Sequence, residues 1–473
     1  MKIKVNVKPQ IIPELDPEFV PAVLWNMEFS RMVKDGSGGR EIYISLTRPN
    51  GSVSVFRTQI FEAGTDFDEL NLFCVERLIK FLLWMKGGYK ITISGAPDIA
   101  AKIARIYSPG GERAFDYEIM GEKIYGRKME LVEAGMSASV TEKEFDIALG
   151  GNTDGCRVGF DLGGSDRKCA ALIDGEVVFS EEIKWDPYFK KDPAWHKAGI
   201  NDSIKRAAAH LPRVDAIGGS AAGVYVDNQV RVASLFRGVS NEDFRKYVVN
   251  IFNELKDEWK VPFVVVNDGE VTALAGAMSM KDHSVLGISM GTSLAAGYVN
   301  PHGRITDWLN ELAFAPIDYR QNAPLDEWSG DRGCGVQYFS QQAISRLLPA
   351  SGISLHNDMP FAEKLVEVQN LMRNNDIRAE RIYRNIGVYF GYAIATYSQF
   401  YDIKNLLFLG RVSSGTGGEI IISEAEKVLR AEFPVLAEKI KIKTPDEQMK
   451  RHGQAAVAAT LPAIAKSVFP ATP

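Results

Sequence analysis

The segment Asp161-Leu162-Gly163-Gly164-Ser165 decides the fold that we expect for this chain. It lies between a buried strand predicted at 158–160 and an antiparallel partner predicted at 169–173, so its glycines form a turn between strands. Glycine has no Cβ, and such a turn lets backbone N–H groups approach phosphate oxygens closely. We expect Ser165 to add a hydroxyl donor and Asp161 to hold Mg²⁺ through water. Alone the motif is weak, because Gly-Gly turns between strands are common.

Four further turns of small or polar residues follow, each after a predicted strand. Strand 263–266 is rich in β-branched residues, as expected of a parallel strand that is buried on both faces. An ordered series of this kind is more specific than any one member. The four turns are the loop 218–223 with Gly219 and Ser220, the pair Asn267-Asp268, the second phosphate hairpin Gly291-Thr292-Ser293, and the loop 410–415 with Gly410, Ser413 and Ser414.

These residue types suit phosphoryl transfer to a hydroxyl group. In that reaction the protein mainly positions the partners and neutralises charge, so it needs phosphate turns, Mg²⁺ and one base. Asp268 stands at the carboxyl end of a predicted buried strand, where ligand crevices of open α/β sheets form, and it can accept the proton of an attacking hydroxyl. The competing interpretation is that Asp268 is only the N-cap of the next helix. The two roles are compatible.

The ordered motifs resemble the ROK family (repressors, open reading frames and sugar kinases) of the actin, hexokinase and Hsp70 superfamily, from residue 156 to the C-terminus. The resemblance implies an α/β fold, a two-lobed actin-like ATPase with ribonuclease H-like lobes. It implies ATP and Mg²⁺ as cofactors, a sugar-like substrate and Asp268 as the base. The ATP contacts that it implies are Gly163, Gly164, Ser165, Gly291, Thr292, Ser293, Gly410, Ser413 and Ser414, with Asp161 at the metal. The expected substrate contacts are Asn267, Asp268, Glu311, Gly219 and Ser220.

One departure concerns a structural zinc that many ROK members bind through one His and three Cys. The corresponding segments here, Glu311-Leu312-Ala313-Phe314 and 327–334, keep only Cys334, and one thiolate cannot form a closed tetrahedral zinc site. We therefore expect no structural zinc. Phe314 and Val336 also stand where the resemblance places two polar sugar contacts, whereas Glu311 remains. Because an unpaired buried hydroxyl is costly, the pocket should not favour the usual hexoses.

Composition agrees with this picture. The chain has 473 residues, of which 45% are hydrophobic and 24% charged, as in a soluble globular protein of about three parts. We expect an N-terminal domain at 1–150, a first lobe at 156–280 joined by a C-terminal helix at 450–473, and a second lobe at 281–449. The net charge of −5 predicts no basic surface for nucleic acid. Four dispersed cysteines, no signal peptide and no membrane span predict a cytoplasmic protein without a membrane partner.

The N-terminal 150 residues match none of these motifs. They predict a hairpin at 41–60, a helix at 68–85 and a strand at 90–95, and this order returns from 158 to 223. One hypothesis is a decayed actin-like half; the alternative is an appended α+β domain. The strands and balanced charge argue against the helix-turn-helix of some ROK repressors. The predicted helix carries Glu76, Arg77 and Lys80 among apolar residues, which indicates an amphipathic packed helix.

Three weaker features leave alternatives open. The aromatic stretch 185–196 is either a substrate-facing insertion or a surface loop, and we expect His196 and His283 in loops. Tyrosines spaced along 383–401 are typical of a core helix or a homodimer helix. The leading hypothesis for function is an ATP-dependent carbohydrate kinase. The competing hypothesis is a non-catalytic nucleotide- or sugar-binding sensor or scaffold.

Overall fold

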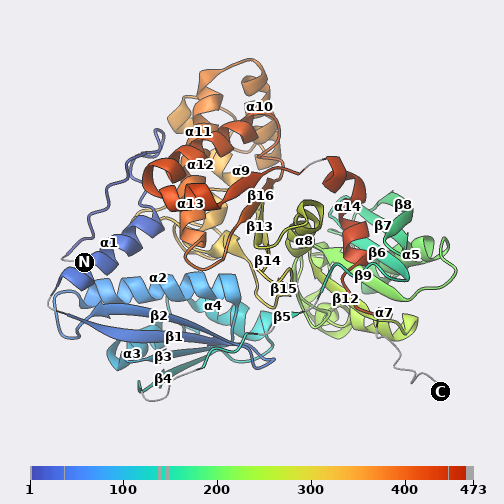
Figure 1. Ribbon diagram of the computed structural model, residues 1–473, viewed down its shortest axis with the longest axis horizontal. Helices are drawn as coiled ribbons and strands as arrows, with labels where there is room; N and C mark the ends of the chain where they lie inside the picture. The colour runs from blue at the N-terminus through green and yellow to red at the C-terminus, as the bar shows by residue number, and fades with distance from the viewer. Residues whose placement is uncertain are drawn as a thin grey trace. The chain divides into compact units, whose positions relative to one another are not determined.

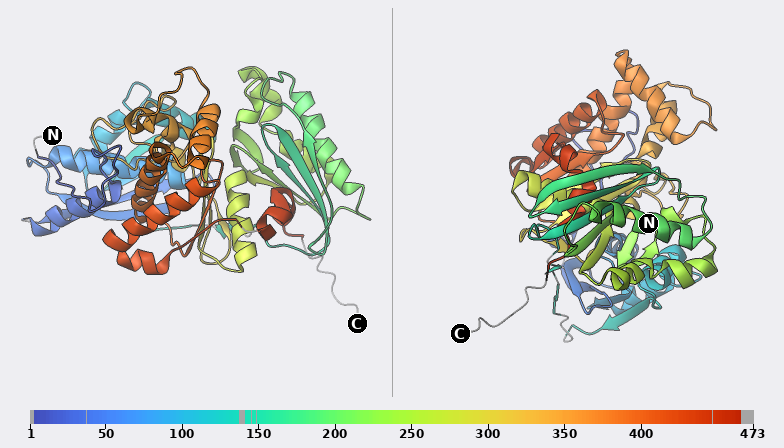
Figure 2. Two further views of the ribbon diagram at one scale, coloured as in Figure 1. Left: turned by 90° about the horizontal axis from the view of Figure 1, so that it is seen from above. Right: turned by 90° about the vertical axis from the view of Figure 1, so that its right-hand side faces the viewer.

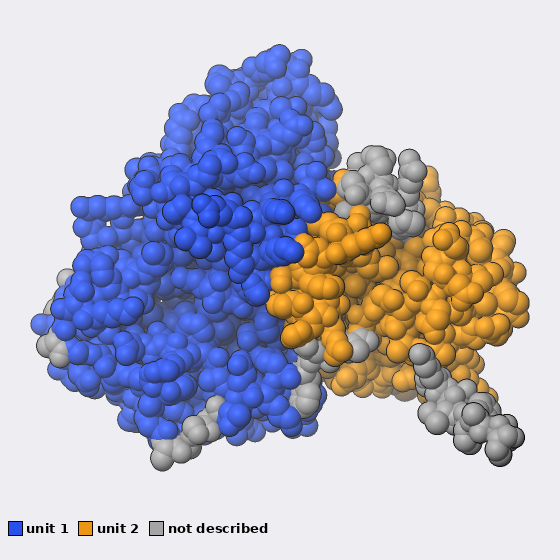
Figure 3. All heavy atoms as spheres, viewed as in Figure 1, with its two compact units in different colours: residues 1–145, 288–296, 307–444 blue, residues 146–287, 297–306, 445–473 orange. Residues whose placement is uncertain are grey.

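A computed structural model of the chain describes residues 3–36, 38–136, 141–144, 146–147, 149–445 and 447–464 (Figure 1). The chain divides into two compact units (Figure 3). Unit 1 comprises 1–145, 288–296 and 307–444, and unit 2 comprises 146–287, 297–306 and 445–473. The N-terminal segment thus shares a unit with most of the second lobe expected at 281–449. The boundaries expected from the sequence, 1–150, 156–280 with 450–473, and 281–449, stay a prediction.

Unit 2 is built on a five-stranded sheet in the order β12-β9-β6-β7-β8. The strands β6, β7 and β8 form an antiparallel meander around the first phosphate turn, and β9 and β12 join β6 in parallel. Parallel neighbours end at the same edge, so three strand ends meet where the sequence places its polar turns. The strands are β6 (Cys156–Leu162), β7 (Asp166–Ile173), β8 (Glu176–Lys184), β9 (Ala216–Ala221) and β12 (Phe263–Asn267).

Alternating side chains of β6 serve the two faces of this sheet. Val158, Phe160 and Leu162 enter a core with the helices α5 (Pro193–Ala208) and α7 (Ile251–Trp259). The opposite face carries α14 (Glu447–Ala459), which lies against the strands (Figure 2). A Cβ on Gly159 would lie 1.8 Å from the carbonyl oxygen of Ala455, so only glycine permits this approach. Asp161 follows Gly159 on the same face as α14.

The remaining elements of unit 2 are short, apart from the helix that directly follows β12 in the chain, α8. The helix α14 ends at Ala459, earlier than the helix expected at 450–473, of which 465–473 lie outside the described residues. The remaining elements of unit 2 are β5 (Asp146–Ile147), β10 (Val224–Val226), β11 (Gln229–Val232), η2 (Ser234–Phe236), α6 (Asn241–Asp243), η3 (Phe244–Val248), α8 (Asp268–Met280) and β15 (Ile305–Thr306).

A second sheet has the strand order β17-β16-β13-β14-β15-β5, and helices accompany it in unit 1. The hairpin of β13 and β14 carries the second phosphate turn, and β16 leads into the loop at 410–415. The elements are β13 (Val285–Met290), β14 (Leu294–Val299), η4 (Leu312–Phe314), η5 (Gly335–Gln337), α9 (Gln341–Ser351), α10 (Phe361–Arg373), α11 (Ile377–Tyr397), β16 (Asn405–Leu409), α12 (Thr416–Glu432), α13 (Pro434–Lys439) and β17 (Lys441–Lys443).

The tyrosine-rich helix α11 is buried within its own unit. Tyr389 and Tyr392 have 0% and 1% of their surface exposed. The N-terminal segment crosses this helix: the Tyr389 hydroxyl donates to Asp16 at 2.8 Å, and the Tyr392 hydroxyl donates to the carbonyl of Ile11 at 3.0 Å. Burial by the chain itself supports the core interpretation of these tyrosines.

The N-terminal segment forms a separate four-stranded sheet in the order β2-β1-β3-β4. Here β1 and β3 are antiparallel, whereas the corresponding pair of unit 2, β6 and β9, is parallel. The strand direction of this sheet therefore differs from that of the sheet in unit 2. Both hypotheses for the segment, a decayed actin-like half and an appended α+β domain, stay predictions. Its elements are α1 (Ala22–Asp35), β1 (Gly39–Thr47), β2 (Val53–Phe61), α2 (Asp68–Lys86), β3 (Lys90–Ser94), α3 (Pro97–Ile106), α4 (Ala114–Glu118), η1 (Ile119–Ile124) and β4 (Glu130–Ala134).

Candidate functional site

The ends of three parallel strands bring the predicted residues of unit 2 together. Asp161 of β6 pairs in register with Ser220 of β9, and the next residue of β9, Ala221, pairs with Asn267 of β12. Asp268 follows directly as the first residue of α8. The candidates for metal binding, substrate binding and proton transfer therefore lie at one edge of the sheet.

Asp161 is buried, with 5% of its surface exposed. Burial raises the pKa of its carboxyl to about 6, and the Asp268 carboxyl adds to the rise, while the Ser220 hydroxyl and the Lys168 ammonium oppose it. A nearby cation stabilises the ionised form of such a buried carboxyl, so this environment suits the predicted Mg²⁺.

Gln454 of α14 is a neighbour of Asp161 that the sequence did not single out. With its amide oriented so that both ends have partners, Gln454 donates to the two Asp161 oxygens at 3.2 and 3.1 Å and accepts from the Thr272 hydroxyl at 2.8 Å. The signal was present, because Gln454 is the one polar side chain in the small-residue run at 453–456. Only the close approach of α14 to β6 places it beside Asp161.

Asn267, and not Asp268, is the N-cap of α8. The Asn267 Oδ1 accepts from the backbone N–H of Gly269 at 2.7 Å, and its Nδ2 donates to the carbonyl of Gly223 at 2.7 Å. The N-cap interpretation of Asp268 is therefore wrong. Burial raises the pKa of the Asp268 carboxyl, against hydrogen bonds from the backbone N–H groups of Gly269 and Asp268. A carboxyl tuned in this direction is suited to accept a proton.

The first phosphate turn is covered by the aromatic stretch that follows β8. The Trp185 indole N–H donates to the carbonyl of Gly163 at 2.8 Å. A Cβ on Gly164 would lie 1.9 Å from the Tyr188 hydroxyl, so any larger residue here requires the Tyr188 ring or the turn to move. The Ser165 hydroxyl donates to Asp166 at 2.9 Å, which brings a carboxylate to the turn. In the part of the chain that the structure describes, the backbone N–H groups of Gly164 and Ser165 donate to no protein acceptor.

His196 is a core residue, so its expected place in a loop is wrong. The helix α5 begins at Pro193, with Asp192 as its N-cap, and His196 lies in its first turns with 0% of its surface exposed. Its Nε2 lies 3.1 Å from the carbonyl oxygen of Pro187 and 3.2 Å from that of Leu235. His196 thus ties the aromatic stretch to the core.

In unit 1, the second phosphate turn lies beside the predicted adenosine loop. The turn is closed by a hydrogen bond from the Gly291 N–H to the carbonyl of Ser293 at 2.9 Å, and Thr292 and Ser293 are exposed. Gly410 approaches Met290 so closely that a Cβ would lie 2.4 Å from the Met290 oxygen, which also accepts from the N–H of Val412 at 3.0 Å. The two predicted ATP loops of this unit are therefore neighbours.

The serines of the adenosine loop shape the loop itself. The Ser413 hydroxyl donates to the carbonyl of Gly410 at 2.8 Å. The Ser414 hydroxyl donates to the carbonyl of Arg411 at 2.7 Å and accepts from Gln369 at 3.0 Å. Each hydroxyl oxygen can still accept a hydrogen bond, but its proton is already donated to a carbonyl of the same loop.

Glu311 precedes η4, and its N–H donates to the carbonyl of Trp84 at 2.9 Å. Phe314 is buried with its ring 4.3 Å from that of Trp84 and 5.0 Å from that of Trp328. Cys334 is buried, and burial raises the pKa of its thiol to about 12. Among the described residues, no three His, Cys, Asp or Glu side chains are grouped so that they could hold a metal ion.

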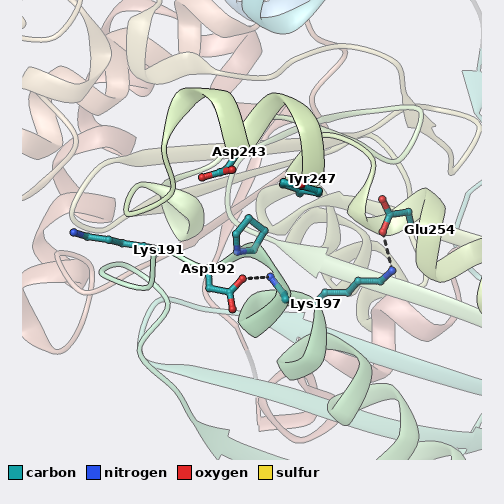
Figure 4. A pocket seen from close by; sticks show the side chains of 8 residues that line it. Lys191, Asp192, Lys197, Asp243, Tyr247 and Glu254 are labelled. Carbon is teal, nitrogen blue, oxygen red and sulfur yellow. Dashed lines mark hydrogen bonds and ion pairs between the residues drawn. The ribbon is translucent and has the colours of Figure 1, made fainter.

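Three surface cavities lie away from the predicted residues. A cavity of about 460 Å³ lies at the start of α5, where Lys197 pairs with Glu254 at 2.7 Å (Figure 4). A cavity of about 220 Å³ lies beside α8 and α14, and one of about 170 Å³ lies beside β1 and β2. None of the three is lined by a predicted site residue. The predicted residues from 161 to 268 belong to unit 2, and those from 291 to 414 belong to unit 1.

No helix among the described residues is long and apolar enough to cross a membrane. No curated protein matches the sequence. The fold has solved counterparts. A ROK hexokinase from Thermus thermophilus is 17% identical with a TM-score of 0.51, and the match covers 64% of this chain and 97% of that one. A ROK family transcriptional regulator, described as a homologue of the Escherichia coli MLC protein, is 20% identical with a TM-score of 0.51, covering 65% of this chain and 78% of that one.

At these identities the likeness shows the fold alone, and the predicted class, a two-lobed actin-like α/β ATPase fold, is confirmed. Kinases and regulators both occur among the similar structures, so the fold by itself selects neither activity. The family model named ROK family matches residues 157–460, which leaves only the N-terminal segment and the last residues outside it. Since this match covers more than half of the 473 residues, the chain belongs to the ROK family.

Proposed function

We propose that this protein is an ATP- and Mg²⁺-dependent kinase that phosphorylates a hydroxyl group of a sugar or sugar-like substrate in the cytoplasm. The observation that carries the proposal is the half-buried Asp268 carboxyl at the shared edge of β6, β9 and β12, next to Asp161. Asp268 is the base that accepts the proton of the substrate hydroxyl. The hexokinase among the similar folds makes a sugar the natural class of substrate.

The residues fit the two cofactors. Asp161 is an oxygen ligand whose ionised form is disfavoured by burial, and Mg²⁺ supplies the missing positive charge. The free N–H groups of Gly164 and Ser165 are donors for phosphate oxygens. We assign the turn at 291–293 to phosphate and the loop with Gly410, Ser413 and Ser414 to the adenosine. The net charge of −5 gives no electrostatic reason to propose nucleic acid as a partner.

The substrate contacts that we propose are Glu311, Asn267, Gly219 and Ser220. Asn267 already holds the helix cap and the carbonyl of Gly223, so it can offer the substrate one N–H and one lone pair in a fixed direction. This preorganisation favours one orientation of the sugar.

The alternative is a non-catalytic sensor that binds nucleotide or sugar. Two contacts favour it: Asp166 places a carboxylate against the Ser165 hydroxyl in the phosphate turn, and Gln454 occupies both oxygens of Asp161. The regulator among the similar folds is consistent with this alternative.

A panel of hexoses, pentoses and N-acetylated hexosamines, assayed for ADP release with MgATP, tests the proposal. We expect one sugar to give steady turnover and Asp268→Asn to lower kcat at least about a hundredfold without loss of folding. Asp257→Asn, at an exposed aspartate of the same unit, is the matched control and should keep full activity. Stabilisation by MgATP with no turnover on any sugar would favour the sensor.

A further inference from the structure

Six charged side chains are buried together in unit 1, in equal numbers of each sign. Helix α2 carries three of them, Glu76, Arg77 and Lys80, which have 7%, 4% and 0% of their surface exposed. Arg113 and Asp116 come from the start of α4, and Asp331 comes from the loop at 327–334. We call these six residues the buried charge network.

Asp331 is the only member that lies outside the N-terminal segment, and it contacts all three cations. Its carboxylate lies 2.6 Å from Arg113, 3.2 Å from Arg77 and 3.5 Å from Lys80. Without Asp331, three buried cations would face only two carboxylates, and an uncompensated buried charge is strongly unfavourable. The N-terminal segment therefore requires this loop to complete its charge balance.

The same helix holds the backbone of Glu311. At the end of α2, the carbonyls of Met85 and Trp84 accept from the N–H groups of Asn310 and Glu311 at 2.8 and 2.9 Å. The Trp84 indole N–H donates to Asp116 of the network at 2.6 Å, and its ring contacts Phe314. The position of Glu311 is thus linked to the charge network through Trp84.

The loop of Asp331 supports the Glu311 segment from its other end. The N–H of Gly335 donates to the carbonyl of Ala315 at 3.0 Å, and the N–H of Ile317 donates to the carbonyl of Gly333 at 2.8 Å. Segment 310–317 is therefore fixed by α2 before Phe314 and by the Asp331 loop after it. Glu311, the proposed substrate contact, therefore lies in a segment held between α2 and the Asp331 loop, and the buried charge network joins these two elements.

We propose that helix α2 of the N-terminal domain positions Glu311 for the substrate, with Lys80 and Asp331 as positioning residues. The N-terminal domain is then a working part of the sugar site and not a separate module. The inference rests on the proposed function for the role of Glu311 as a substrate contact. The contacts that hold the segment do not depend on that function.

The test measures amide hydrogen exchange in the full-length protein, in peptides that cover 308–316 and in α12 for comparison. The variants are Asp331→Asn, Lys80→Met and the double variant, in which the remaining network is again balanced. Glu112→Gln is the matched control, because Glu112 also faces Arg113, at 3.9 Å, but its side chain is 71% exposed. We expect exchange at 308–316 to accelerate about tenfold in each single variant and to return toward wild type in the double variant.

Equal acceleration in α12 and at 308–316 would overturn the proposal, because the network would then stabilise the whole unit without positioning Glu311. With the sugar that the panel identifies, the double variant keeps the wild-type KM, whereas each single variant raises the KM for the sugar and leaves the KM for MgATP unchanged. An unchanged KM for the sugar despite faster exchange also overturns it. If no sugar is phosphorylated, the kinase proposal fails, and the exchange result still decides whether α2 holds this segment.

Discussion

Replacing Asp161 with Asn is expected to stabilise the protein at neutral pH. The Asp161 side chain is buried, and burial is the main cause that raises its pKa from 3.8 to about 6. A carboxyl group whose pKa is raised by folding binds its proton more tightly in the folded state. Its contribution to stability is therefore complete below about pH 4 and is lost as the pH rises through about 6. The rise corresponds to about 3 kcal/mol. An Asn side chain cannot ionise and avoids this loss.

Urea unfolding of the wild type and of Asp161→Asn, in EDTA and at intervals from about pH 4 to about pH 8, measures the difference. We expect the free energy of unfolding of the variant, relative to the wild type, to rise by up to about 3 kcal/mol over this range, mostly between about pH 4 and 6. Asp257→Asn is the control and should show no such trend. A difference that stays flat or falls with pH would refute the reasoning, because Asp161 would then be ionised in the folded protein without cost.

Two further substitutions test the surroundings of the phosphate turn and of the metal carboxylate. Gly164→Ala brings a Cβ to 1.9 Å from the Tyr188 hydroxyl, so the Tyr188 ring or the turn must shift. We expect weaker binding of MgATP by calorimetry, an overpacking cost of about 1–3 kcal/mol, and partial recovery when Tyr188→Ala is added. Gln454→Glu places a second carboxyl beside Asp161, and we expect a lower Tm at neutral pH and a larger rise in Tm on adding MgCl₂ than in the wild type; equal responses to MgCl₂ would contradict a metal at Asp161.

The sequence predicted the parts of the fold that local patterns encode. The turns after β6, β12 and β16 were expected at or next to the residues where the strands end, because β-branched runs and glycine-rich turns are local signals. The loop expected at 218–223 begins later than predicted, because residues 218–221 continue the strand β9. Strand direction in the N-terminal sheet was not encoded in this way. A hairpin, a helix and a strand follow one another in both sheets, but the third strand pairs in opposite directions with the first. Only long-range pairing distinguishes the two topologies.

The candidate site was predictable to the same extent. Asp161, Ser220 and Asn267 were expected together and lie at one sheet edge, where Asp161 pairs with Ser220 and Asn267 pairs with the next residue, Ala221. Gln454 was not expected beside them, because its contact depends on how closely α14 approaches Gly159. His196 was misplaced for a related reason, since a lone histidine in an aromatic stretch gives no local sign that its Nε2 will lie between the carbonyls of Pro187 and Leu235.

The charges of α2 show how a correct inference from sequence can still miss a function. Glu76, Arg77 and Lys80 indicated a packed amphipathic helix, and the charged face of such a helix ordinarily points to water. They are instead among the most buried charges of unit 1. An isolated buried charge would cost several kcal/mol, so such a pattern survives only if each charge has a partner. Asp331, more than 200 residues away in the sequence, is the partner that Arg77, Lys80 and Arg113 share. A network that is costly to break and gains little over apolar packing contributes specificity more than stability, which is what the placement of one substrate side chain requires.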